Sequence, residues 1–205
     1  MVSDGKIDRM AKRSADTGAR ILDAAERLVQ QRGFNGFSYA DVAAELKITT
    51  ASLHYHFAGK AKLGRALIER YAERFTEALA TIEARLPDAR ARLDAYVDVY
   101  GDVLRGRRLC LCGMLAAEYQ TLPKPMRQSV IQFFDDNEAW LTRVLDAGRQ
   151  EGSLRFAGSA VDAARMLISG LEGAMLVARP YGEVGRFRAA VAQLLTGLAA
   201  TPAGH

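Results

Sequence analysis

Residues 37–63, FSYADVAAELKITTASLHYHFAGKAKL, decide the fold. Asp41 follows Ser38 by three residues, which is the spacing of a capping box at the start of a helix. The apolar periodicity behind it predicts a short helix that ends near Leu46. After a short turn, Thr49 is placed to cap a second helix over 50–57. Two short helices joined by a turn of three or four residues predict a helix-turn-helix unit.

The sequence on both sides of this unit also has helical periodicity. Apolar residues on one face predict a helix over 16–32, and Gly33 is a natural left-handed stop for it. A long helix is expected from about residue 60 to Leu86, because Pro87 ends it. Five more helices are expected, at 93–106, 114–120, 126–152, 159–179 and 184–198. The predicted fold is all-α, with about nine helices, no strand, and two domains at 15–75 and 76–201.

The net charge of the chain is concentrated in its first third. Residues 1–75 hold 13 Lys and Arg against 9 Asp and Glu, whereas residues 76–205 hold 15 of each kind. This asymmetry is expected if the first third meets a polyanion. The basic N-terminal tail is interpreted either as a solvated end or as an arm that lies in a minor groove, and its cations are Lys6, Arg9, Lys12 and Arg13.

Composition also predicts the compartment. No apolar run approaches the roughly 20 residues that cross a bilayer, and the N-terminus lacks the apolar core of a signal peptide. Cys110 and Cys112 are the only cysteines, too few for a secreted disulfide framework. A cytoplasmic protein without membrane contact is expected.

The second short helix carries side chains that suit a DNA groove. A major groove about 12 Å wide admits one helix, whose leading end must be small and polar to approach base edges. Longer side chains behind it, and the starts of the neighbouring helices, are placed to reach phosphates. A metal pair at His54 and His56 is less favoured, because positions two apart on a helix diverge. The expected DNA contacts are Ser38, Tyr39, Thr49, Thr50, Ala51, Ser52, His54, Tyr55, His56 and Lys60.

Roughly residues 15–75 resemble the TetR family of transcriptional regulators. The positions that carry the resemblance are Ser38, Asp41-Val42-Ala43, Ile48-Thr49, Leu53, His56-Phe57, Lys60 and Leu63. The chain departs from the family pattern at Lys47, where glycine is usual, and at His54 and Gly59. A left-handed Lys47 would cost about 1 kcal/mol. The resemblance implies an N-terminal three-helix helix-turn-helix DNA-binding domain and a C-terminal helical domain that binds an effector and dimerises.

The resemblance also implies a ligand cavity between the helices of the second domain. Aromatic side chains in such a domain are more often core than cavity wall, but some must line it. The candidates are Tyr96, Tyr100, Met114, Glu118, Phe133, Trp140, Leu171 and Met175. A buried Glu118 would need a polar partner. Because the domain has no net charge and many Tyr, Phe, Trp and Met residues, an apolar or aromatic small-molecule effector is expected.

Two cysteines and one apolar stripe each have two interpretations. Cys110 and Cys112 are ordinary buried residues, or Cys110 is a redox or electrophile sensor whose pKa Arg105, Arg107 and Arg108 lower. The stripe in the last helix is either an intrachain core or, as we favour, part of a homodimer seam through the last two helices. Its members are Val184, Phe187, Val191, Leu194 and Leu198.

The predicted function is therefore a ligand-responsive repressor that binds a near-palindromic double-stranded operator as a homodimer and is released by a small molecule. The alternatives are a repressor triggered by cysteine chemistry and an architectural DNA-binding protein without an effector. An enzyme is not expected, because no nucleophile–base spacing, phosphate-binding glycine loop or metal cluster is found, and no cofactor is implied.

Overall fold

The fold is known from a computed structural model, which describes residues 4–199 and, within them, side chains from residue 14 onward. Within that range the chain forms α-helices and two short 3-10 turns, and its only β-pairing is one isolated bridge, between Leu154 and Ala199. The helices are α1 (Asp4–Arg32), α2 (Tyr39–Leu46), α3 (Thr50–His56), α4 (Lys60–Arg85), α5 (Ala89–Arg105), α6 (Leu111–Ala117), α7 (Lys124–Glu151), α8 (Ala160–Ala178) and α9 (Val184–Thr196). The predicted all-α fold is confirmed.

The helix-turn-helix forms as its local sequence predicts. Ser38 caps α2 by accepting from the backbone N–H of Asp41, and the Asp41 carboxylate accepts in return from the backbone N–H of Ser38. Thr49 caps α3 by accepting from Ser52 N at 3.2 Å. Between the two helices, Lys47 adopts φ 56°, the left-handed geometry that glycine usually supplies.

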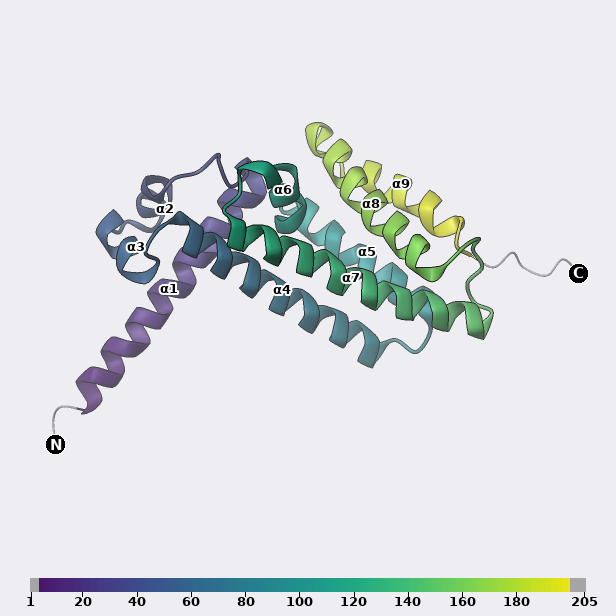
Figure 1. Cartoon of the computed structure of the whole chain (residues 1–205), viewed down its shortest axis with the longest axis horizontal. Coiled ribbons are helices and arrows are strands. Elements are labelled where there is room, and N and C mark those ends of the chain that lie inside the picture. The colour runs from purple at the N-terminus through teal and green to yellow at the C-terminus, as the bar shows by residue number, and fades with distance from the viewer. Residues whose placement is uncertain (1–3, 200–205) are drawn as a thin grey trace, which may run out of the picture.

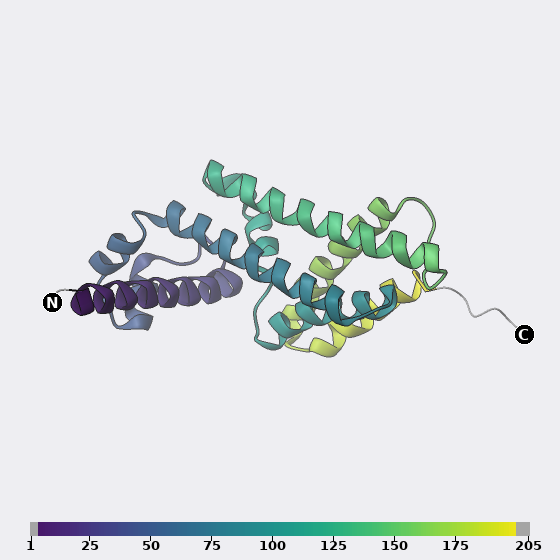
Figure 2. The ribbon, with the colours of Figure 1, turned by 90° about the horizontal axis from the view of Figure 1, so that it is seen from below.

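The helices form two bodies that share α4. α1, α2 and α3 gather at one end, and α4 leaves this group and runs beside α7 into the larger helical domain (Figure 1). α8 packs against α7, and α9 packs against α8 and α5. Figure 2 shows α4 spanning both bodies. One continuous helix therefore joins the two bodies.

Several expected helix limits were wrong, among them the start of α5, which is Ala89 rather than residue 93. α1 begins at Asp4 rather than Asp16, because residues 4–15 contain no proline, and the apolar periodicity starts only where the helix meets the core. The helix expected at 114–120 is α6, which begins at Leu111 and ends at Ala117, before a 3-10 helix at Tyr119–Thr121. The side chains of the basic tail (Lys6, Arg9, Lys12 and Arg13) and the expected domain end at residue 201 lie outside the described residues.

Within 4–199, each helix is too short or too polar to span a membrane.

Candidate DNA-binding surface and effector cavity

α3 presents one open face and one buried face. Thr50, Ala51, His54 and Tyr55 are exposed, and their spacing places them on the same side of the helix. Leu53 on the opposite side is completely buried in the core, so it anchors α3 and fixes its orientation. The exposed face holds small side chains at the helix start and longer ones behind, which is the shape that a major groove accepts.

Several of the expected DNA contacts also make contacts within the protein that stabilise this surface. The Ser38 hydroxyl donates to Asp41 Oδ2 at 2.6 Å, and Ser38's hydrogen bonds lower the pKa of the Asp41 carboxyl. The Tyr39 hydroxyl donates to Phe57 O at 2.8 Å, and its ring lies 4.8 Å from the ring of His54. Ser52 and His56 are half-buried. These groups support the turn, whereas the exposed side chains of α3 remain open to solvent.

Lys60 differs from the expected phosphate contact. Its ammonium donates to Phe37 O and lies 4.7 Å and 4.4 Å from the ring centres of Phe34 and Phe37. Partial burial lowers the pKa of this amine. Lys60 therefore ties the start of α4 to the segment before α2, and its contact with a phosphate stays a prediction. The sequence could not show this, because it depends on how two rings and a carbonyl converge.

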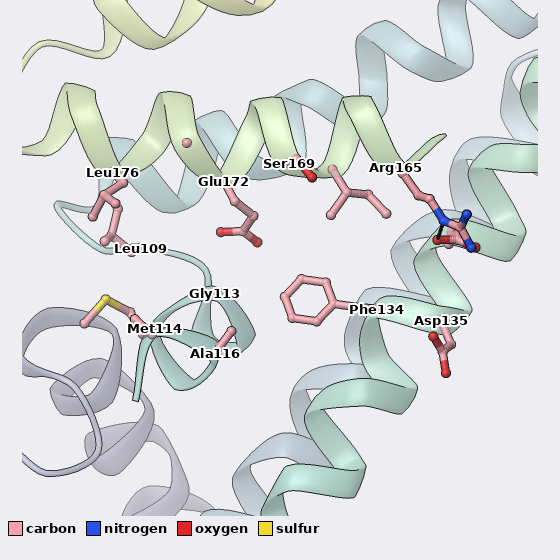
Figure 3. A pocket seen from close by; sticks show the side chains of 14 residues that line it. Leu109, Gly113, Met114, Ala116, Phe134, Asp135, Arg165, Ser169, Glu172 and Leu176 are labelled. Atoms are coloured by element: carbon pink, nitrogen blue, oxygen red, sulfur yellow. Dashed lines mark hydrogen bonds and ion pairs between the residues drawn. The ribbon is translucent and has the colours of Figure 1, made fainter. Parts of the chain in front are cut away.

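A cavity of about 450 Å³ lies between α6, α7 and α8 (Figure 3). The wall from α6 and its N-terminal flank includes Leu109, Gly113 and Met114. Phe134 projects into the space from α7, and Ile168, Ser169, Glu172 and Leu176 close it from α8. Its size falls within the range of small-molecule sites. The cavity is therefore a candidate effector site.

Of the eight expected ligand contacts, Met114 lines this cavity and the other seven lie elsewhere, so their contact with an effector stays a prediction. Tyr96 stacks on Trp140 at 5.6 Å, and its hydroxyl lies 3.1 Å from that of Tyr100. Phe133 joins the same aromatic cluster through Phe75. Phe133 and Trp140 border a different hollow, between α4 and α7. Leu171 and Met175 are completely buried. The aromatic side chains mainly build the core, as their size favours.

Glu118 does not line the cavity, but its carboxylate has the polar partners that a buried position requires. Its carboxylate accepts from Phe34 N at 2.5 Å and from Asn35 N at 3.2 Å. It therefore holds the loop between α1 and α2 from the C-terminal end of α6. Gly33 permits this approach, because a Cβ there would lie 2.7 Å from Glu118 Oε1.

Other contacts join the same two regions. Leu109 N donates to Gln30 O at 3.2 Å, and Arg108 Nη1 donates to the Gln30 side chain at 3.2 Å. Arg179, after α8, donates to Gln31 O and lies 3.7 Å from the sulfur of Met114. The end of α1 is thus attached to the elements that wall the cavity.

The electropositive setting expected for Cys110 was wrong. Arg105 pairs with Asp102, and Arg108 is engaged with Gln30. Cys110 is buried, and burial together with the Glu172 carboxylate raises the pKa of its thiol well above the ordinary value. Cys112 is buried as well, and its pKa is raised for the same reasons. A sensing role for Cys110 stays a prediction without its original physical support.

Sequence reasoning missed Glu172, although a signal was present. Glu172 is the only charged residue between Met166 and Ala178, a run that is otherwise apolar or small. A lone acidic residue in such a run either reaches solvent or has a buried role. Here one of its carboxylate oxygens is buried within the wall of the cavity.

The apolar stripe of the last helix belongs to the interior of one chain, which corrects its favoured assignment to a dimer seam. Phe187, Val191 and Leu198 are buried, and Leu194 packs against Gly170 of α8. The apolar side chains that remain exposed on this side lie on α8 and just after it: Met166, Leu176, Val177 and Tyr181. An intrachain stripe and a seam share the same near-heptad spacing, so spacing alone could not separate them.

These features define a class: an all-helical DNA-binding protein with an N-terminal helix-turn-helix and a cavity-bearing helical domain. The family model for bacterial regulatory proteins of the tetR family matches residues 21–67, and the model for the tetracyclin repressor-like C-terminal domain matches residues 89–194. The chain belongs to the TetR family, and it is a DNA-binding transcriptional regulator.

Individual relatives agree with this membership. The HTH-type transcriptional repressor NemR of Escherichia coli (strain K12) is 29% identical over 174 residues, which cover 80% of this chain and 84% of NemR. A TetR-family regulator from Agrobacterium tumefaciens has a TM-score of 0.88 at 31% identity, covering 91% of this chain and 100% of its own. A TetR regulator from Legionella pneumophila has a TM-score of 0.80 at 30% identity, covering 87% and 95%.

Proposed function

We propose that this protein is a ligand-responsive repressor that binds a near-palindromic operator as a homodimer and releases it when a small molecule fills the cavity between α6, α7 and α8. The observation that carries the proposal is the link from that cavity to the DNA-binding end: α6 lines the cavity and, through Glu118, holds the loop that precedes α2. An architectural protein would need no such cavity. The fold and the family membership favour a regulator over an enzyme.

The operator can be identified directly from a random DNA pool. We expect the selected sites to be near-palindromes whose half-sites lie about one helical turn apart, because a twofold protein imposes its symmetry on DNA. The free face of α3 should read the bases, with Thr50, Ala51, His54 and Tyr55 nearest to them. Purely asymmetric sites, or no enrichment, would contradict the proposal.

The trigger acts through a difference in affinity between two arrangements of the protein. A ligand shifts the equilibrium only if it binds one arrangement better than the other. A ligand beside Met114 and Ala117 would displace α6, and Glu118 would carry that displacement to the start of α2. Operator DNA must then weaken the ligand by the same factor by which the ligand weakens DNA.

The contribution of Glu118 to the stability of the protein can be measured. Glu118→Ala leaves the N–H groups of Phe34 and Asn35 without their acceptor, and we expect the free energy of unfolding to fall by about 1–3 kcal/mol. The two amides should also exchange hydrogen with solvent much faster. Urea unfolding and hydrogen exchange measure the two effects.

The matched control is Glu138→Ala, which removes a carboxylate paired with Arg165 at the surface. That change should alter stability by less than about 1 kcal/mol and leave the two amides protected. Unchanged exchange at Phe34 and Asn35 in Glu118→Ala would show that Glu118 does not hold the loop.

A further inference from the structure

Glu172 lacks a countercharge in a cavity with mainly apolar walls. The residue as a whole is half-buried, but its Oε1 atom is out of contact with solvent and has no hydrogen-bond partner. Among the described residues no cation pairs with this carboxylate, and a hydrogen bond with the buried Cys110 thiol lowers its pKa. Leaving a buried carboxylate unpaired is costly, so such groups usually have a ligand or a function.

The neighbouring helix is built to receive this carboxylate. A Cβ on Gly113 of α6 would overlap Glu172 Oε2, so glycine lets the carboxylate lie here without shifting. Figure 3 shows Glu172 reaching from α8 toward Gly113, with the Phe134 ring facing the same space. The carboxylate and the aromatic ring thus border one volume.

The other charges around the cavity make it more acidic. Asp135 and Glu138 lie on the α7 wall, and the one cation of the lining, Arg165, donates to Glu138 Oε2 at 2.8 Å. Arg165 is therefore already paired. The remaining titratable groups near Glu172 are neutral at physiological pH, since burial raises their pKa values: Cys110, Cys112, Tyr71, Tyr96 and Tyr100.

We infer that the effector is an organic cation with an apolar body, whose positive group lies between the Glu172 carboxylate and the Phe134 ring. Met114, Ile168 and Leu176 would cover the body. This inference rests on the proposed function, because it names the chemical class of the ligand in the same cavity. Carboxylates and aromatic faces both attract a quaternary or protonated amine, most strongly where water is excluded. The effector class thereby changes from the expected apolar or aromatic molecule to a cation that carries an apolar body.

The pKa of Glu172 supports this assignment. Burial raises the pKa of its carboxyl to about 7. The group is therefore mostly protonated at pH 6 and mostly ionised at pH 8. A permanently charged ligand should bind more tightly at pH 8, when the carboxylate carries its charge.

The test uses a matched pair of probes on the whole protein without DNA. (4-Phenylbutyl)trimethylammonium is compared by calorimetry with its neutral isostere, in which carbon replaces the nitrogen. We expect the cation to bind roughly tenfold or more tightly than the isostere at pH 8 and to lose most of this preference at pH 6. Glu172→Gln should remove the preference at both pH values and leave the affinity of the isostere unchanged.

The control variant is Asp135→Asn, which removes an exposed carboxylate of the same cavity and should keep the preference. Equal binding of the two probes to the unmodified protein, or binding of neither, would overturn the inference. An equal loss of both probes in Glu172→Gln would show a structural role only and would overturn it too. Operator selection is independent of these titrations, so its failure would contradict the proposed function while leaving the cation site standing.

Discussion

Ala51→Glu is expected to abolish specific operator binding while leaving the protein folded. Ala51 is exposed on the face of α3 that also carries Thr50 and Tyr55. In a major groove this position would lie against base edges between two rows of phosphates, where a carboxylate is both too large and repelled. We expect affinity to fall by about 1,000-fold, to the level of non-specific binding. A titration of the selected operator against a scrambled duplex at fixed salt measures this.

The matched control is Ala80→Glu, the same change at an exposed position of α4 far along the effector domain. Both variants should unfold at nearly the same urea concentration as the unmodified protein, because exposed helix substitutions change stability little. Ala80→Glu should also keep its operator affinity. If Ala51→Glu bound the operator within a few-fold of the original affinity, α3 would not be the helix that enters the groove.

The helix-turn-helix was predictable because local chemistry specifies it. The capping box of Ser38 and Asp41, the cap at Thr49 and the apolar position of Leu53 each depend on residues a few positions apart. The left-handed geometry at Lys47 was expected only from the resemblance to the family, in which glycine is usual at this position. The exposed face of α3 follows from the same helical periodicity.

The effector domain was predictable as helices but not as a site. The roles of Tyr96 and Glu118 depend on partners at positions 140 and 34, and no local pattern shows which helices will meet. A cavity forms where helix packing leaves space, so its lining residues depend on the tertiary arrangement of the helices. Glu172 had a local signal, its isolation in an apolar run, but its approach to Gly113 is a tertiary contact.

The apolar stripe of α9 was likewise predictable from its spacing, whereas its partners were not. Val191→Glu is expected to unfold the protein rather than to separate a dimer. Val191 is only 1% exposed, among side chains of its own chain. Burying an unpaired carboxylate costs several kcal/mol, a large share of the roughly 5–15 kcal/mol that stabilises a typical domain. Urea unfolding should therefore show a midpoint shifted far down or no cooperative transition.

The dimer should instead respond to changes on the exposed face of α8. Met166 and Val177 are 43% and 66% exposed, and they lie on the same side of the helix with the small residue Gly173 between them. Exposed apolar side chains grouped in this way favour an interface between subunits. We expect the double variant Met166→Glu with Val177→Glu to stay folded, because both positions are exposed within one chain. It should sediment as a monomer. A monomer binds only one half-site, so its operator affinity should also fall steeply. An intact dimer in this double variant, or a folded monomer from Val191→Glu, would instead indicate that the apolar stripe of α9 forms the dimer interface.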